Sequence, residues 1–104
     1  MTKYNAKRTW STIWNRMFAS KMEAQRAEEL FLMQKAGVIS DLQFQHKFVL
    51  SVRPKVTIAI DFVYMENGAW VYEDSKGVLT RDFRTKLSWL KEKYRIDVIL
   101  NRGY

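Results

Sequence analysis

Residues 20–36 carry the pattern of a helix. Ser20 is a typical N-cap residue with Glu23 three positions later, strong helix formers follow, and Gly37 comes just after the last of them. The preceding segment, 9–19, combines apolar side chains at helical spacing with many aromatic and β-branched residues, so a helix and a strand both remain open there.

Three strand patterns follow this helix. Residues 42–50 alternate between apolar and polar side chains, which is typical of a strand with one buried face. The side chains expected to share that face are Leu42, Phe44, His46, Phe48 and Leu50. Residues 56–64 form a second, mostly apolar strand, and 69–76 form a third. Between them stands Asn67-Gly68, the strongest short hairpin signal, because both residues tolerate the positive φ angles of a type I′ turn.

A second helix and a last short strand complete the pattern. Thr80 is the N-cap candidate of this helix. Its apolar side chains, at helical spacing, are Phe83, Leu87, Leu90 and Tyr94. With a strand at 96–100, the order predicts an α/β fold with a mixed central β-sheet flanked by helices. The sequence has no repeat, low-complexity tract or linker, so we expect one domain over 1–104, with 1–19 either a basic N-terminal arm or an extra element.

The composition adds a positive charge and removes several kinds of site. The chain has 18 Lys and Arg residues against 11 Asp and Glu, a formal net charge of +7, which suits nucleic acid but equally suits solubility or another anionic surface. It has no Cys, and His46 is its single His, which excludes disulfides, thiolate zinc sites and metal sites needing two imidazoles. No apolar run approaches the roughly 20 residues of a membrane span, and no signal-like segment begins the sequence, so we expect a cytoplasmic protein without membrane contact.

The acidic residues of the predicted hairpin are the most informative candidates for chemistry. Asp61 interrupts an otherwise apolar strand, where Asp is depleted and needs a reason. With a two-residue loop setting the register, Asp61 lies directly opposite Asp74, and Lys76 projects from the same face. Opposed carboxylates repel unless something neutralises them, and a divalent cation would do so. The structural alternatives are a solvated edge Asp and a solvated strand end, and a three-residue loop would shift the pairing.

Glu23 is a further candidate because of its place on the first helix. It shares a stripe with Ala27, Leu30 and Gln34, which is part of the face expected to pack on the sheet. The alternative is a capping box in which the Glu23 carboxylate bonds back to the amide of Ser20. The sequence does not decide between the two roles.

Taken in order, these residues resemble the PD-(D/E)XK nuclease superfamily, in which a carboxylate on a first helix precedes an Asp on one strand and Asp-x-Lys on the paired strand. The motifs are Ser20-x-x-Glu23, Ile60-Asp61-Phe62 and Asp74-Ser75-Lys76-Gly77, followed by Asp82 and Lys86. They look like those of the phage junction-resolving endonuclease I type, a Holliday junction resolvase. Residues 3–98 also resemble small phage proteins of the superfamily that carry a domain-of-unknown-function label. The chain departs from the pattern at Ile60 and His46, where Pro is expected, and in a longer segment at 10–19.

The resemblance implies a restriction-endonuclease-like core with Glu23, Asp61, Asp74 and Lys76 as its catalytic set. Asp61 and Asp74 would coordinate one or two Mg²⁺ ions, for which Mn²⁺ is expected to substitute. The carbonyl of Ser75 and the carboxylate of Glu23 would supply further oxygen ligands. Lys76 would position the attacking water or help to deprotonate it. The implied activity is Mg²⁺-dependent hydrolysis of phosphodiester bonds in branched DNA such as Holliday junctions, in the host cytoplasm if a phage encodes the protein.

Basic residues are expected to contact the DNA backbone without reading bases. The second helix has a basic stripe that ends at Arg95, although a solvated charged face is the ordinary alternative. The predicted nucleic-acid contacts are Lys7, Arg8, Arg81, Arg84, Lys86 and Lys91, with Lys86 a secondary contact implied by the resemblance.

The assembly and the rival functions remain open at this point. The run 30–33 makes the first helix apolar around more than half of its circumference, beyond what one sheet needs to cover, and predicts either a second buried face or a dimer contact. We expect a homodimer, because resolving enzymes of the resembled type make two symmetric cuts. The rival functions are a non-catalytic nucleic-acid-binding protein with a nuclease fold, acting in phage DNA replication or packaging, and a nuclease acting on linear DNA.

Overall fold

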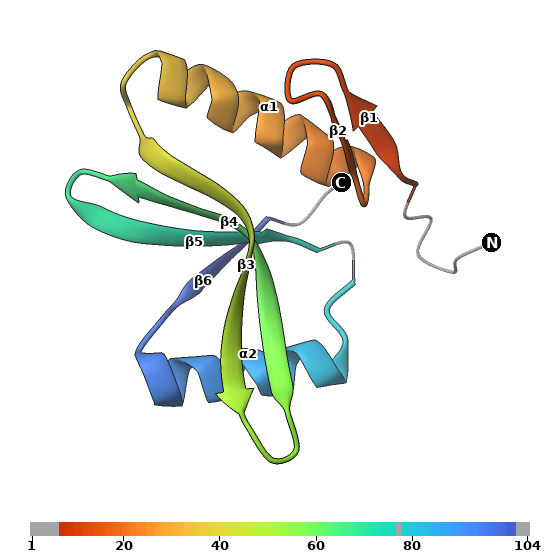
Figure 1. The fold of residues 1–104 in the computed structure, drawn as a ribbon, viewed down its shortest axis with the longest axis vertical. Helices are drawn as coiled ribbons and strands as arrows, with labels where there is room; N and C mark the ends of the chain where they lie inside the picture. Colours follow the sequence, from red (N-terminus) through yellow and green to blue (C-terminus); the bar gives the residue numbers. More distant parts are fainter. Residues whose placement is uncertain (1–6, 77, 102–104) are drawn as a thin grey trace.

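The computed structural model describes residues 7–76 and 78–101, and this part of the chain contains six strands and two helices (Figure 1). In chain order they are β1 (Thr9–Ser11), β2 (Arg16–Phe18), α1 (Lys21–Lys35), β3 (Ser40–Ser51), β4 (Val56–Glu66), β5 (Ala69–Ser75), α2 (Arg81–Tyr94) and β6 (Val98–Asn101). Both predicted helices and the four predicted strands are found. Residues 1–6 of the predicted N-terminal arm, and Gly77 of the Asp-Ser-Lys-Gly motif, lie outside the described residues.

Strands β3 to β6 form one mixed sheet in the order β3-β4-β5-β6. The first three strands pair antiparallel, and β6 pairs parallel with β5. The Asn67-Gly68 turn has positive φ angles at both residues, as a type I′ turn requires. The β4–β5 register therefore begins with Glu66 opposite Ala69, as predicted. The predicted α/β fold, a mixed sheet with two helices, is confirmed.

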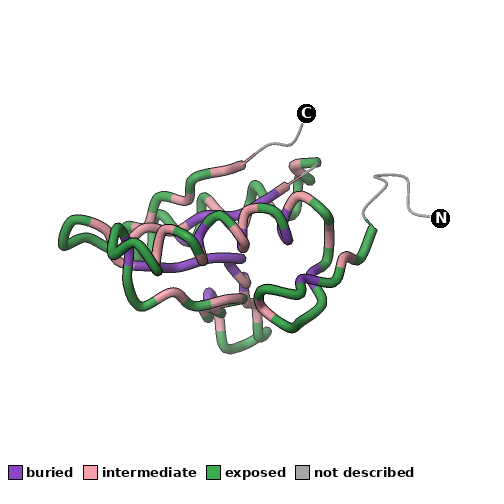
Figure 2. The backbone as a smooth tube through the Cα atoms, turned by 90° about the horizontal axis from the view of Figure 1, so that it is seen from above, coloured by how far each residue is buried: buried purple, intermediate pink, exposed green. Residues whose placement is uncertain are grey.

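Each helix covers its own hydrophobic core. The core against α1 consists of Phe18, Ala24, Ala27, Leu30, Ile39, Phe62 and Tyr64. The core against α2 consists of Leu50, Ile58, Ile60, Val63 and Leu90. Figure 2 shows buried positions along the central strands and exposed positions at the turns. Within residues 7–76 and 78–101, no helix is long and apolar enough to span a membrane.

A strong twist divides the β3–β4 pair between these two cores, and the far half of the pair crosses α2 in Figure 1. Ile60 packs in the core against α2, whereas Phe62, two residues later, packs in the core against α1. Residues two apart on a regular strand face the same side, so β4 rotates around Asp61. On β3, Phe44 lies opposite Phe62 and the residue at 46 lies opposite Ile60. Gln45 lies between these two positions, and its φ of 53° is in the left-handed region. Asp61 therefore stands at the boundary between the two cores.

The prediction of a single apolar face along β3 is wrong for the same reason. Leu42 and Phe44 pack with the core against α1, whereas Phe48 and Leu50 belong to the core against α2. The ring of His46, placed between them, lies 4.7 Å from the ring of Phe48, centroid to centroid. His46 is thus a packing residue on the second half of the strand.

The segment left open by its pattern, 9–19, forms the antiparallel β1–β2 hairpin, a sheet of its own that packs on α1. Trp14, in its turn, donates a hydrogen bond from Nε1 to the carbonyl of Ala27 at 2.6 Å. The Trp14 ring also meets Phe31 edge-on, with 5.3 Å between centroids. The hairpin thus covers part of the apolar helix surface beyond the sheet and leaves Leu32 exposed. Within the apolar run, Leu30 and Met33 thus belong to the core against α1, Phe31 is partly covered by the hairpin, and Leu32 is exposed.

Candidate metal-binding and catalytic site

Asp61 and Asp74 meet across β4 and β5, just beyond the last paired residues of the ladder. The backbone amide of Asp61 donates to Asp74 Oδ1, and the amide of Ser75 donates to Asp61 Oδ2, each at 2.9 Å. Each carboxylate thus binds backbone through one oxygen, which leaves Asp61 Oδ1 and Asp74 Oδ2 for other partners. Both side chains are buried. The structure therefore brings together the two carboxylates that the hairpin register predicts.

Lys76 lies beside Asp74, as expected from their two-residue spacing. Its Nζ is 3.3 Å from Asp74 Oδ2, an ion-pair distance, and 4.3 Å from the ring centroid of Phe83 on α2. This contact lacks hydrogen-bond geometry, so Asp74 Oδ2 is a buried oxygen without a hydrogen-bond partner among the described residues, as is the Ser75 hydroxyl oxygen. Burying a carboxylate oxygen without a full set of partners is costly, and a further cation would relieve that cost.

Glu23 reaches the same site from the first turn of α1. Ser20 Oγ accepts a hydrogen bond from the Glu23 amide at 3.1 Å, which is one half of the expected capping box. The Glu23 carboxylate instead accepts from Gln45 Nε2 at 3.1 Å, and the same nitrogen donates to Asp61 Oδ1 at 2.8 Å. The backbone of Glu23 therefore serves the helix cap, while its buried side chain points to the sheet.

Gln45 is a site residue that sequence reasoning missed. Its amide nitrogen lies between the carboxylates of Glu23 and Asp61, where a positively charged group would also be favoured. No pattern could have identified it, because the turn between β3 and β4 is too long to set a register in the way that Asn67-Gly68 does. Its left-handed φ within a strand is also invisible in the sequence.

Burial and mutual repulsion raise the pKa of two of these carboxyl groups. Burial, followed by the negative charge of Asp61, raises the pKa of Glu23 to about 7, although the hydrogen bond from Gln45 opposes the rise. The same two causes raise the pKa of Asp74 to about 6, opposed by the nearby charge of Lys76. A bound cation would stabilise the ionised forms of both groups.

The carboxylate oxygens of this site suit a hard cation, but they do not form a complete metal-binding site in this structure. Among residues 7–76 and 78–101, no group of three or more His, Asp or Glu side chains is placed to hold a metal ion. The amide of Gln45 stands between the carboxylates of Glu23 and Asp61. Asp74 Oδ2 is the buried carboxylate oxygen without a hydrogen-bond partner among the described residues, and it is available for Mg²⁺. Asp61 Oδ1 and Glu23 Oε2 both accept from Gln45 Nε2, so this amide competes with a cation at both oxygens.

The predicted DNA contacts differ in whether an acidic side chain lies beside them. Arg81 and Arg84 are exposed on the first turns of α2, and Lys7 and Arg8 are exposed before β1. Lys86 Nζ lies 3.4 Å from Asp82 Oδ2. Lys91 Nζ lies 2.6 Å from Asp97 Oδ2 in an exposed ion pair. Lys91 is therefore a weaker candidate for phosphate binding than the sequence pattern suggests, because a carboxylate already neutralises it.

A second buried acid, Glu73, faces away from Asp74 and holds several elements together. Arg26 of α1 donates from Nε and Nη2 to the two Glu73 oxygens, each at 2.8 Å. The hydroxyl of Tyr64 and the amide of Asn101, on β4 and β6, also donate to this carboxylate. Burial would raise the pKa of Glu73, but the hydrogen bonds from Arg26, Tyr64 and Asn101 outweigh it and hold the pKa below its usual value. In the sequence, the available sign of this network is that the hairpin register places the acidic Glu73 opposite the apolar Phe62.

The raised pKa values predict that the metal-free protein becomes less stable as the pH rises from about 4 to about 8. Glu23 and Asp74 bind protons more tightly in the folded than in the unfolded chain. Their contribution to stability is thus complete below their unfolded pKa values and is lost as the pH rises through about 6 and about 7. Urea unfolding at a series of pH values, with chelator present, measures this slope. The Glu23→Gln variant should show a shallower slope, and a wild-type stability that rises steadily over this range would contradict the assignment.

The comparisons with known proteins support a coarser assignment than the nuclease resemblance. Residues 1–101 match a family model described as "Protein of unknown function (DUF1064)". Neither the curated proteins nor the solved structures give a match. The family match agrees with the resemblance to small proteins that carry a domain-of-unknown-function label, but it does not show a nuclease family. Because it spans nearly the whole sequence, the chain belongs to the DUF1064 family.

Proposed function

We propose that this protein is a Mg²⁺-dependent, structure-selective endodeoxyribonuclease that hydrolyses phosphodiester bonds, preferably in branched DNA such as Holliday junctions. The observation that carries the proposal is the convergence of Asp61, Asp74 and Lys76 at one point of the sheet, with Asp74 Oδ2 buried and without a hydrogen-bond partner among the described residues. The backbone hydrogen bonds account for one oxygen of each carboxylate, but not for the second oxygen of Asp74 or for Lys76 beside it. A phosphodiester-cleaving site would give both a role.

The residues that would hold Mg²⁺ are Asp61 and Asp74, with the carbonyl of Ser75 and the Glu23 carboxylate as further ligands. Mn²⁺ should substitute, because it accepts the same oxygen donors. When bound, Mg²⁺ would stabilise negative charge on the attacking and leaving oxygens of the phosphate. The Gln45 amide, which hydrogen bonds to Glu23 Oε2 and Asp61 Oδ1 in this structure, must rearrange before these two oxygens can act as ligands.

Lys76 has the contacts of a group that acts on the attacking water. Its ammonium is held between Asp74 and the ring of Phe83, which restricts where the side chain can point. From this place it can donate a hydrogen bond to a water or to a phosphate oxygen beside Asp74. Helix α2 begins at Arg81, shortly after Lys76 in the chain, so exposed Arg81 and Arg84 are suited to bind the adjoining DNA backbone.

A second function, in a different class, is favoured by the Gln45 contacts. If the amide stays between Glu23 and Asp61, the protein is a nucleic-acid-binding module that keeps the nuclease fold but does not cut. Such a module would act in phage DNA replication or packaging. Its DNA binding would depend on salt but not on Mg²⁺ or on Asp61.

Cleavage assays on matched substrates test the proposal. We predict that purified protein with Mg²⁺ nicks a four-way junction and cuts the corresponding linear duplex more slowly, whereas protein with chelator cuts neither. Two symmetric nicks at the junction would accord with the predicted homodimer. Salt-sensitive binding without cleavage under any divalent cation would contradict the proposal and favour the binding module. Equal rates on both substrates would leave a nuclease that acts on linear DNA.

A further inference from the structure

The outer face of the β1–β2 hairpin exposes large apolar side chains. Trp10 pairs with Met17 across the hairpin, so the two side chains share a face. They are 52% and 42% exposed, and Ile13 in the turn is also exposed. Phe18, the neighbour of Met17 in sequence, points the other way and is buried against α1. The hairpin thus has one face anchored in the core and one apolar face at the surface.

The inner contacts hold this hairpin in one position. Ser11 Oγ donates a hydrogen bond to Glu28 Oε2 at 2.7 Å, and Trp14 Nε1 donates to the Ala27 carbonyl at 2.6 Å. Trp14 also lies edge-on against Phe44 of β3, with 4.8 Å between centroids. The outer face is therefore presented by a fixed element, and binding to it would cost little ordering entropy.

The charged side chains of the hairpin segment are of one sign, because residues 7–22 contain no acidic residue. Lys7 and Arg8 are exposed before β1, whereas the Arg16 guanidinium packs over the rings of Phe18 and Phe44. Exposed aromatic rings among cations are the combination that binds unpaired nucleic-acid bases, because the rings stack on the bases while the cations pair with phosphates. A symmetric contact with a second copy would instead bring the same cations against one another, which disfavours that occupant.

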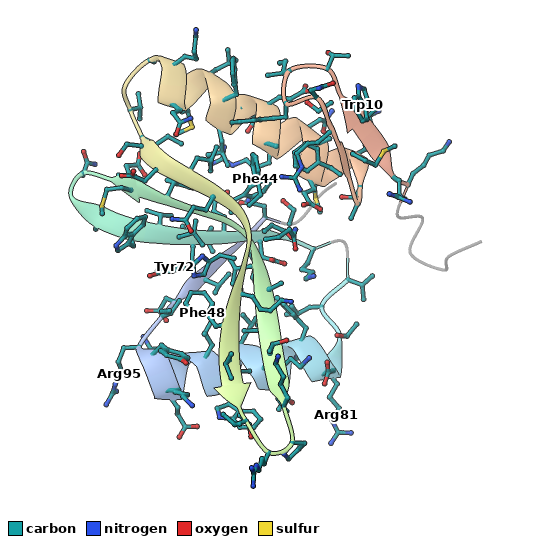
Figure 3. All side chains as sticks on the ribbon, viewed as in Figure 1. Trp10, Phe44, Phe48, Tyr72, Arg81 and Arg95 are labelled. Carbon is teal, nitrogen blue, oxygen red and sulfur yellow. The ribbon has the colours of Figure 1, made fainter. Side chains whose placement is uncertain are left out.

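The hairpin lies next to the first turn of α1 in the chain. Strand β2 leads directly into the Ser20 cap of α1, and Glu23 follows in the first turn. In Figure 3 Trp10 extends from the hairpin at the edge of the molecule, on the side away from the β4–β5 turn. The hairpin therefore adjoins the end of α1 that carries Glu23.

We propose that the outer face of the β1–β2 hairpin is a stacking platform for unpaired bases, with Trp10 against the base and Lys7 and Arg8 on the flanking phosphates. This proposal rests on the DNA-binding part of the proposed function. It names the feature of the DNA that the hairpin would recognise, which is bases left unstacked where a duplex branches or is interrupted. Cleavage is not required for it.

The test is DNA binding without divalent metal, so that no cutting occurs. Fluorescence anisotropy compares a duplex containing an unpaired bulge with the fully paired duplex. Trp10→Ala is expected to weaken binding to bulged DNA by about 5- to 150-fold, the range for losing one stacked base, and to change binding to paired duplex by less than about twofold. Trp10→Tyr, which keeps an aromatic ring, should retain most of the affinity.

Trp70 supplies the matched control, because it is 46% exposed at the start of β5, and Figure 1 shows the β4–β5 turn on the opposite side of the molecule from the β1–β2 hairpin. Trp70→Ala should leave binding to both DNAs unchanged. Equal loss on both DNAs, or no loss, with Trp10→Ala would overturn the platform. So would a dimer of the wild type that becomes a monomer on the same substitution in sedimentation, because the face would then be an interface between copies. Junction cleavage without dependence on Trp10 would overturn the platform alone, and Trp10-dependent binding without cleavage would overturn the nuclease alone.

Discussion

Mg²⁺-dependent cleavage of a four-way junction is expected to fall by at least about 100-fold when Asp74 is replaced by asparagine. Replacing groups that merely orient metal ligands costs roughly 10- to 100-fold in many metalloenzymes, so losing the charge of a direct ligand should cost at least the upper value. Single-turnover cleavage rates of the wild type and Asp74→Asn, at saturating Mg²⁺ and DNA, measure the effect.

Asparagine is the suitable replacement because it keeps the Oδ1 acceptor for the Asp61 amide. It also removes a carboxylate whose ionisation burial opposes, so the fold should persist, which circular dichroism can check. Asp97→Asn is the matched control, since it removes an exposed acid paired with Lys91 and should leave the rate within about threefold of wild type. Mg²⁺-dependent cleavage by Asp74→Asn within about tenfold of wild type would remove this residue from the ligand set.

Stability should respond most strongly to Arg26. Arg26→Met is expected to lower the free energy of unfolding by about 3–5 kcal/mol, because it leaves the buried Glu73 carboxylate without its countercharge. The hydrogen bonds from Tyr64 and Asn101 remain but carry no positive charge. For a domain whose total stability is about 5–15 kcal/mol, such a loss is large. Urea unfolding at neutral pH measures it.

Glu29→Gln tests the exposed ion pair of Arg26 with Glu29 separately from its buried pair with Glu73. Glu29 accepts from Arg26 Nη1 at 2.9 Å on the helix surface, and an exposed pair of this kind contributes about 0.3–0.5 kcal/mol. A loss of less than about 1 kcal/mol in Arg26→Met would show that the buried network does not hold α1 to β5. Arg26 lies one turn beyond Glu23 on α1, so the same network also sets where Glu23 stands relative to Asp74.

Local sequence signals were sufficient to predict the central hairpin and its two carboxylates. The Asn67-Gly68 turn allows one tight loop geometry, and that geometry determines which residue of β5 opposes each residue of β4. The position of Asp61 opposite Asp74 follows from it by counting. Helix starts at Ser20 and Thr80 were predictable for a similar reason, because an N-cap depends on a side chain and a backbone amide three residues away.

Long-range geometry accounts for what the sequence could not predict. The twist that assigns Phe44 and Phe48 to different cores arises from packing on two helices. The alternation of apolar and polar residues along β3 does not indicate such a twist. The hairpin at 9–19 gains its stability from α1, so its own pattern remained ambiguous. Gln45 reaches the site through a register and a left-handed φ that only the folded chain defines.

The central claim is that Asp61 and Asp74 form a divalent cation site, and a calorimetric titration of the purified protein with Mn²⁺ tests it most directly. We predict that the wild type and Asp97→Asn bind Mn²⁺ with the same affinity and that Asp74→Asn loses this binding. Mn²⁺ binding by Asp74→Asn with wild-type affinity, or a folded wild type that binds no divalent cation either alone or with junction DNA, would contradict the account.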